Sequence, residues 1–343
     1  MCSGGFMKDN NPKKDWLNEI VYRLSRPYIL VLALIFTLIP SGKLTDALES
    51  GAEFLKIDTD AKAVAMGSAY TAMANGIEAI HYNPSGLAGL KRAEAGFSHT
   101  NWLLDSSHDF IGIAMPMGKK AEVRGKRSEV RSQRSEIVMG LGFTRLTNGS
   151  MEGRAADRGR TRGFDAYDQS IALGAAKNFG PYAVGGAIKY IQSAIAGSRA
   201  SAFAVDIGAG RKLTGLPVYV ALAVQNLGAP MRYIDQSDPL PLSVSAGLLL
   251  TALPGVDLSL DLKRFINEKQ NNYKLGMNYN ILPGFALRTG YMMNMFGKRE
   301  AESVKGGFSA GVGLYFLNTG LDYSMSPFGE LGNVQKLSVK KKF

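Results

Sequence analysis

The feature that most constrains the fold of this chain is a repeat of strand-length segments after residue 93. Segments of about ten residues alternate between large apolar and small or polar side chains, and turn residues separate them. A period of two is the signature of a β-strand, and about ten residues allow a tilted strand to cross a membrane. The sequence therefore predicts an all-β fold with about 14 antiparallel strands. The segments are 94–102, 108–117, 136–146, 168–178, 181–193, 200–211, 216–226, 241–252, 255–264, 271–281, 284–293, 304–314, 315–325 and 334–343.

One segment illustrates the two faces. Phe203 and Val205 alternate with Ala204 and Asp206. In a membrane barrel the small or polar face lines the lumen and the apolar face meets lipid. A soluble β-sandwich turns its apolar face inward instead, and alternation by itself does not separate the two folds.

The connections between segments favour the barrel. Short turns such as Phe179-Gly180 and Leu253-Pro254 alternate with longer connections such as 227–240 and 294–303. Transmembrane barrels have short periplasmic turns and long external loops. We therefore predict a transmembrane outer-membrane β-barrel, with residues 147–167 as a long external loop.

The first residues differ in composition from the rest. Basic residues precede an apolar stretch at 28–39, and Thr45-Asp46-Ala47 provides small residues beyond it. This arrangement is typical of a secretory signal, and a stretch of 12 residues is short for a membrane-spanning helix. We predict a signal peptide at residues 1–47, with an uncleaved anchor as the alternative.

The formal net charge of the chain is +11, and many basic residues fall at 118–135. The near-repeat Arg127-Ser128-Glu129 and Arg134-Ser135-Glu136 marks this stretch as a low-complexity insertion. No aromatic residue is interleaved with the basic ones for base stacking, so we expect no nucleic-acid partner.

A segment ahead of the strands has a different character. Residues 61–75 have a loose helical spacing of apolar residues, with Asp60 as a candidate N-cap and Asn75-Gly76 as a stop. Alone, this segment suits an ordinary soluble core. Because membrane-length strands follow it, we predict a short N-terminal helical plug at 48–92 inside a barrel at 93–343. The candidate plug and hinge residues are Met66, Tyr70, Met73, Asn83, Pro84, Ser85 and Gly86.

Motifs of catalysis are missing from the sequence. It has no G-x-S-x-G, H-E-x-x-H or C-x-x-C pattern. His99 and His108 flank the first long turn with Asp109 nearby, and we interpret them as polar residues at strand ends. We expect no enzyme activity, no cofactor and no metal site.

Several motifs resemble a known family. Residues 63–72 read A-x-x-M-G-x-A-Y-x-A, and residues 82–88 read Y-N-P-S-G-L-A. Further matching stretches are GAIKY at 186–190, VQNLG at 224–228 and SPFGELG at 326–332. In this order, they resemble the PorV/PorQ family and, more loosely, the FadL-type transporters of hydrophobic compounds. The basic insertion and Gln335-Lys336 depart from the family pattern.

The resemblance implies a fourteen-stranded barrel with an amino-terminal hatch, located in the bacterial outer membrane among outer-membrane lipid. A PorV-like role is that of an accessory to protein secretion or export of the type IX kind. Its partners would be secretion-system proteins or exported proteins, meeting loops 147–167 and 227–240. The alternative is a FadL-like channel that holds a hydrophobic small molecule in an apolar pocket at the plug. A barrel with a purely structural role is a third possibility.

Overall fold

A computed structural model describes residues 50–103, 105–118, 137–154, 159–233, 236–295, 305–327 and 332–343. The predicted signal peptide at 1–47 and nearly all of the predicted insertion at 118–135 lie outside these residues.

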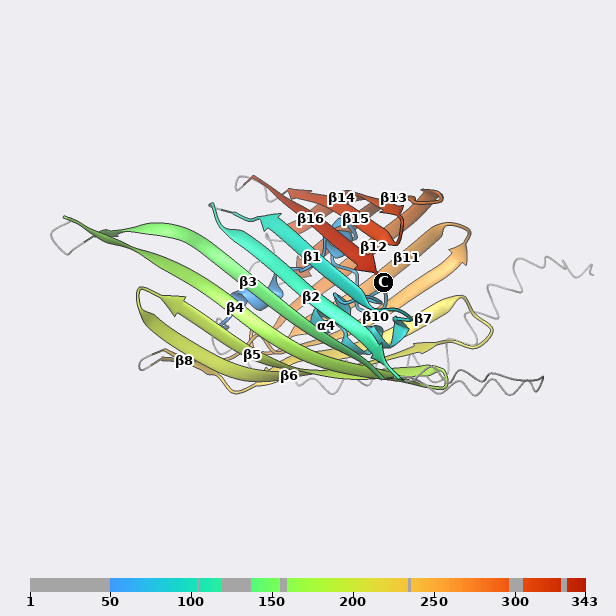
Figure 1. The fold of residues 1–343 in the computed structure, drawn as a ribbon, viewed down its shortest axis with the longest axis horizontal. Helices are drawn as coiled ribbons and strands as arrows, with labels where there is room; N and C mark the ends of the chain where they lie inside the picture. The colour runs from blue at the N-terminus through green and yellow to red at the C-terminus, as the bar shows by residue number, and fades with distance from the viewer. Residues whose placement is uncertain are drawn as a thin grey trace, which may run out of the picture. The chain divides into compact units, whose positions relative to one another are not determined.

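The described strands form one closed antiparallel barrel of fourteen strands, in which β1 closes against β16 (Figure 1). This confirms the predicted fold class, and each of the fourteen predicted segments is a strand. The barrel strands are β1 Glu94–Asn101, β2 Ser107–Met117, β3 Ile137–Arg154, β4 Arg160–Phe179, β5 Tyr182–Ile195, β6 Ser198–Lys212, β7 Val218–Gly228, β10 Ser243–Leu253, β11 Val256–Phe265, β12 Gln270–Leu282, β13 Phe285–Met295, β14 Lys305–Phe316, β15 Thr319–Pro327 and β16 Asn333–Lys342.

The two faces of the wall are arranged as in a membrane barrel. On β6, Ala204 and Asp206 are buried, whereas Phe203 is 70% exposed and Ile207 is 52% exposed. The other strands likewise turn large apolar side chains outward. An exterior of this composition is stable against hydrocarbon and not against water.

Two of the predicted loops are wrong in part. Residues 147–167 were expected to form a loop, but β3 and β4 continue through most of this range and pair as far as Arg154 with Arg160. The neighbouring strand β2 begins only at Ser107, which pairs with Thr147, so the ribbon of β3 and β4 extends past it. Residues 227–240 hold a small hairpin of β8 Met231–Tyr233 and β9 Gln236–Asp238.

Residues 50–93, called the inner segment here, lie inside the barrel. The segment contains the short helices η1 Glu53–Lys56, α3 Ala61–Ala65, α4 Ala79–Tyr82 and η2 Pro84–Gly89. Helix α3 contacts β13 to β16, and η2 contacts β3 to β6 on another side of the lumen. The segment therefore spans the lumen from wall to wall.

The predicted helix over 61–75 is wrong in extent, because α3 ends at Ala65. Gly67 and Ser68 follow with positive φ angles of 59° and 62°, which a helix does not tolerate. Asp60 does not cap α3 with its side chain. Its carboxylate instead forms an ion pair with the barrel wall, described below.

Candidate functional site: the barrel interior

The inner segment touches the wall at positions where the wall has no side chain. A Cβ atom added to Gly290 of β13 would lie 2.0 Å from the backbone of Met66 and Gly67. A Cβ added to Gly185 of β5 would lie 2.5 Å from the carbonyl oxygen of Pro84. Glycine at these positions admits backbone-to-backbone contact that any larger residue would prevent.

The predicted hinge is a capped turn packed against the wall. Asn83 Oδ1 accepts hydrogen bonds from the backbone N–H of Ser85 at 3.1 Å and from its hydroxyl at 2.8 Å. Asn83 Nδ2 donates to the carbonyl oxygen of Thr71 at 3.0 Å. All three polar contacts are buried, and they join two parts of the inner segment. Asn83 thus starts η2 and holds its place.

The other candidate residues predicted from the sequence are also in the interior. Met66, Tyr70 and Met73 are buried and belong to one apolar cluster with residues of the wall. The ring of Tyr70 packs edge-on against Tyr82, with ring centroids 5.0 Å apart. The structure therefore brings all seven predicted residues into the packed part of the inner segment.

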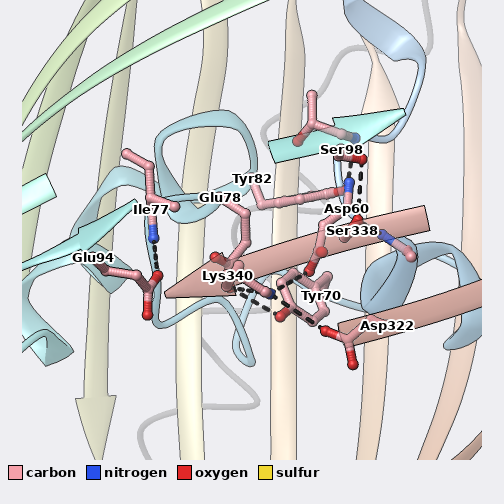
Figure 2. Close-up of polar contacts among 12 residues, drawn as sticks. Asp60, Tyr70, Ile77, Glu78, Tyr82, Glu94, Ser98, Asp322, Ser338 and Lys340 are labelled. Carbon is pink, nitrogen blue, oxygen red and sulfur yellow. Dashed lines mark hydrogen bonds and ion pairs between the residues drawn. The ribbon is translucent and has the colours of Figure 1, made fainter. Parts of the chain in front are cut away.

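A cluster of charges centred on Lys340 of β16 joins the inner segment to the wall (Figure 2). Its Nζ lies 2.9 Å from Asp60 Oδ2, 3.6 Å from Glu78 Oε1 and 3.9 Å from Asp322 Oδ2. Asp60 and Glu78 come from the inner segment, and their side chains are each only 3% exposed. Tyr70 donates a further hydrogen bond to Glu78 at 3.1 Å.

The second cation of this cluster is Arg288, which forms its ion pair with a carboxylate of the wall and not with the inner segment. Arg288 Nη1 lies 2.8 Å from Asp322 Oδ1, and both side chains are fully buried. Arg288 Nε also donates to Asn278 at 2.9 Å, which holds the guanidinium in one orientation. Asp322 thus lies between Arg288 and Lys340 and pairs with both cations.

The pKa values of the two carboxylates of the inner segment shift in opposite directions. Burial by itself would raise the pKa of Asp60, but Lys340, with smaller contributions from other cations, outweighs burial and lowers it. Burial raises the pKa of Glu78, and the neighbouring carboxylates Asp60 and Glu94 add to the rise against the opposing effect of Lys340. Asp60 is therefore the carboxylate of the inner segment that pairs more strongly with Lys340, in agreement with the shorter distance between them.

The irregular backbone of the inner segment finds hydrogen-bond acceptors on the wall. Asp261 Oδ2 accepts from the N–H groups of Tyr70 at 2.8 Å and Thr71 at 2.6 Å. Glu94 accepts from Ile77 N–H at 2.9 Å (Figure 2). Buried backbone groups need such partners wherever helix and sheet do not supply them. The role of Asp261 and Glu94 was not predicted from the sequence, although an acidic residue at an inward position of an alternating strand indicates a contact inside the barrel.

A cavity of about 1020 Å³ lies between the inner segment and the loop ends of the strands. Its volume is at the upper end of the range for small-molecule sites. Apolar side chains from both the inner segment and the wall form much of its lining. They are Phe54, Ile57, Val64, Trp102, Leu146, Phe265, Met292 and Val334.

Three lysines from separate strands also line the cavity: Lys263 of β11, Lys274 of β12 and Lys336 of β16. Lys263 donates to Gln225 Oε1 at 2.8 Å, and Lys336 donates to the carbonyl oxygen of Asp58. Within the described residues, none of the three is paired with a carboxylate at ion-pair distance. The cavity therefore combines apolar surface with three lysines that lack an ion pair, and the carboxylates of Glu53 and Asp58 line it as well.

The histidines do not form a catalytic group with one another. His99 points outward and lies 2.6 Å from Asp109, whereas His108 is buried on the inward face. The barrel wall separates them. His81 of the inner segment lines the cavity, and burial, followed by Lys189 and Lys263, lowers its pKa well below the usual value.

No protein-family model matches the chain, and no curated protein matches it. Solved structures do match. The monoaromatic hydrocarbon channel CymD aligns with a TM-score of 0.60 at 12% identity, over 83% of this chain and 97% of that one. The Pseudomonas putida toluene transporter TodX aligns with a TM-score of 0.59 at 9% identity, over 86% and 98%. A Pseudomonas aeruginosa FadL homologue gives 0.54 at 9% identity, over 83% and 98%.

The chain has the fold of these FadL-type channels. At identities this low the likeness concerns the fold, and these neighbours are channels and transporters, not enzymes. With its apolar exterior, the closed barrel belongs in the bacterial outer membrane. The PorV/PorQ resemblance and the secretion role predicted from it are not supported by these comparisons.

Proposed function

We propose that this protein is an outer-membrane channel for hydrophobic small molecules. The observation that carries the proposal is the cavity of about 1020 Å³, which is lined in part by apolar side chains and ends at the inner segment. The FadL-type fold supports this function, because the neighbouring structures include a hydrocarbon channel and a toluene transporter.

The inner segment is the plug of this channel. We propose with it the division of the chain into a signal peptide at 1–47, a plug at 48–92 and a barrel at 93–343. In the plug, Met66, Tyr70 and Met73 supply apolar packing. The turn from Asn83 to Gly86 anchors the plug against the wall of β5 and β6, where Gly185 and Gly208 leave room for it.

The lysines of the cavity favour molecules that carry an anionic end. Lys263, Lys274 and Lys336 line one cavity without an ion-pair partner among the described residues, and a bound anion would pair with them. The apolar side chains opposite them would hold the remainder of the molecule. The preferred substrate is therefore hydrophobic over most of its surface and negative at one end.

A set of three matched aromatic probes tests this function: naphthalene, 2-naphthoate and 2-naphthylamine. Binding to the full protein in detergent micelles is measured by calorimetry, with empty micelles as the blank. We expect 2-naphthoate to bind most tightly, and Lys263→Met with Lys336→Met to remove its advantage over naphthalene.

The variant Ile57→Trp places a larger side chain in the cavity and should weaken all binding. Ile111→Trp is the matched control, because Ile111 points outward and is 55% exposed. Binding that is unchanged in Ile57→Trp, or no stronger than to empty micelles, would refute a channel function for this cavity.

A further inference from the structure

The periplasmic end of the barrel, where the short turns lie, carries positive charge on one side only. Apart from the inward-facing Lys340, seven cationic residues of the described chain lie at this end, from β16 through β1 to the end of β6. The turns of the other side, 213–220, 248–259, 276–287 and 311–321, contain no lysine or arginine, and Arg288 beyond them is buried and faces inward. The seven residues are called the cationic arc here: Lys91, Arg92, Lys177, Arg211, Lys212, Lys341 and Lys342.

Few carboxylates of the described residues lie at the same end, apart from the interior charge cluster of Figure 2. Glu94 is buried and faces inward, and it lies 3.7 Å from Lys342. Asp257 lies outside the arc and accepts a hydrogen bond of 2.9 Å from Asn278. The terminal carboxylate follows at Phe343. The seven cations therefore outnumber these carboxylates, and the arc is positive.

Three members of the arc lie on the outward face of the wall. Lys177, Arg211 and Lys341 occupy the positions that carry exposed apolar side chains further along their strands. Lys177 Nζ lies 5.3 Å from the ring centroid of Phe179, and the guanidinium of Arg211 lies 4.7 Å from that of Tyr182. These two rings are register partners and are 57% and 47% exposed. Cations beside exposed aromatic rings are typical of the boundary between hydrocarbon and headgroups.

The three outward cations lie at nearly the same depth. The register row of Lys341 leads through β1, β2 and β3 to Leu173 on β4 and continues through β5 to Val205 on β6. With a strand spacing of about 4.8 Å and a tilt of about 40°, this row rises by about 12 Å to β4 and by about 19 Å to β6. Lys177 lies four residues back toward the periplasm from Leu173, or about 10 Å, and Arg211 lies six back from Val205, or about 16 Å. The three cations therefore agree in depth to about 3 Å.

We propose that the cationic arc binds the phosphates of anionic phospholipids in the inner leaflet, so that these lipids gather beside β16, β1 and β4 to β6. Outward cations at one depth, directly below exposed apolar side chains, follow the plane in which headgroup phosphates lie. A protein partner would not require its contacts to keep to that plane. This inference concerns the outer surface and does not depend on what the cavity binds.

Quenching of tryptophan fluorescence by brominated lipids tests the proposal on the full chain, in a background of Trp16→Phe with Trp102→Phe. The reporter Val184→Trp lies within the arc, because Val184 is outward, 43% exposed and the register partner of Lys177. The reporter Leu314→Trp lies outside the arc, at an outward position of β14 that is 48% exposed. The vesicles are dioleoylphosphatidylcholine with a small fraction of brominated phosphatidylglycerol or of brominated phosphatidylcholine.

We expect phosphatidylglycerol to associate about fivefold or more tightly than phosphatidylcholine at the reporter of residue 184, since each basic residue near a membrane surface contributes about a fivefold preference for anionic lipid. At the reporter of residue 314 the two lipids should quench equally. Lys177→Gln with Arg211→Gln should remove the preference at residue 184. Arg160→Gln with Arg199→Gln is the matched control at the external ends of the same two strands and should leave it unchanged.

Three results would overturn the proposal. The first is a preference for phosphatidylglycerol that is absent at residue 184 or equal at both reporters. The second is a preference that persists in Lys177→Gln with Arg211→Gln. The third is a reporter at residue 184 that neither lipid quenches, because protein, such as a second copy of the chain, would then cover the arc.

Discussion

The strongest prediction concerns the anchoring of the inner segment by Lys340. The substitution Lys340→Met removes the cation that lies 2.9 Å from Asp60 and 3.6 Å from Glu78, while keeping an unbranched side chain of similar length. Both carboxylates are 3% exposed, so they would be left without their cation in a water-poor interior. Removing one partner of a buried ion pair costs about 3–5 kcal/mol.

The substitution destabilises the contact between the inner segment and the wall. The barrel itself is affected less, because its strands keep their backbone hydrogen bonds. A loss of about 3–5 kcal/mol raises the population of the released segment roughly a hundredfold to a few thousandfold. Hydrogen exchange measured by mass spectrometry on peptides covering residues 61–82 reports such openings. We expect faster exchange in these peptides and unchanged exchange in the strands.

Lys342→Met is the matched control two residues further along β16. Lys342 is 57% exposed and lies 3.7 Å from Glu94. Glu94 also accepts a hydrogen bond from Ile77, which remains in this variant. An ion pair with so exposed a partner contributes about 0–1 kcal/mol. Equal exchange rates in the two variants, or no change in Lys340→Met, would show that the charge cluster does not anchor the segment.

Three further predictions address the same interior. Gly290→Ala should destabilise the packed segment by about 1–3 kcal/mol through overpacking, whereas Gly307→Ala, with nothing within 4 Å of its added Cβ, should be neutral in the same denaturant titration. Asn83→Ala should cost about 1–3 kcal/mol by leaving buried partners unpaired, and exchange in residues 83–89 should rise; unaltered exchange would mean that Asn83 caps nothing essential. The raised pKa of Glu78 means that its protonated form is favoured in the folded state, so its contribution to stability is present below its ordinary pKa of 4.5 and is lost as pH rises through the folded value. The protection factors of residues 61–82, which are exchange rates corrected for the intrinsic pH dependence of amide exchange, should therefore rise as pH falls through the folded pKa of Glu78, and Glu78→Gln should remove this rise; a Glu78→Gln profile of protection factors identical to that of the unsubstituted protein would contradict the assignment.

The number of strands, and the residues that share each face of a strand, were predictable from the sequence alone. Alternation between residues such as Phe203 and Ala204 is a local property with a period of two, so it is visible without any knowledge of strand partners. The change of character at residues 48–92 was visible for the same reason, because period-two alternation is absent from this stretch.

Where the inner elements begin and end depends on contacts with distant strands. Asp60 looked like a helix cap because local spacing favours that role, but Lys340, 280 residues later, pairs with its carboxylate. The helix it was expected to start stops after five residues, where the segment turns to meet Gly290. The extension of β3 and β4 was likewise hidden, since its polar residues lack alternation and are paired only with each other.

The cavity and its three lysines also depend on distant strands meeting around one lumen. Lys263, Lys274 and Lys336 occupy inward positions that read singly as polar lumen residues. Their combination into one positive, partly apolar site arises when the barrel closes and the inner segment fills the space beneath them. Local preferences of the chain specify strands, but closure brings together residues whose separation along the sequence carries no signal of their contact.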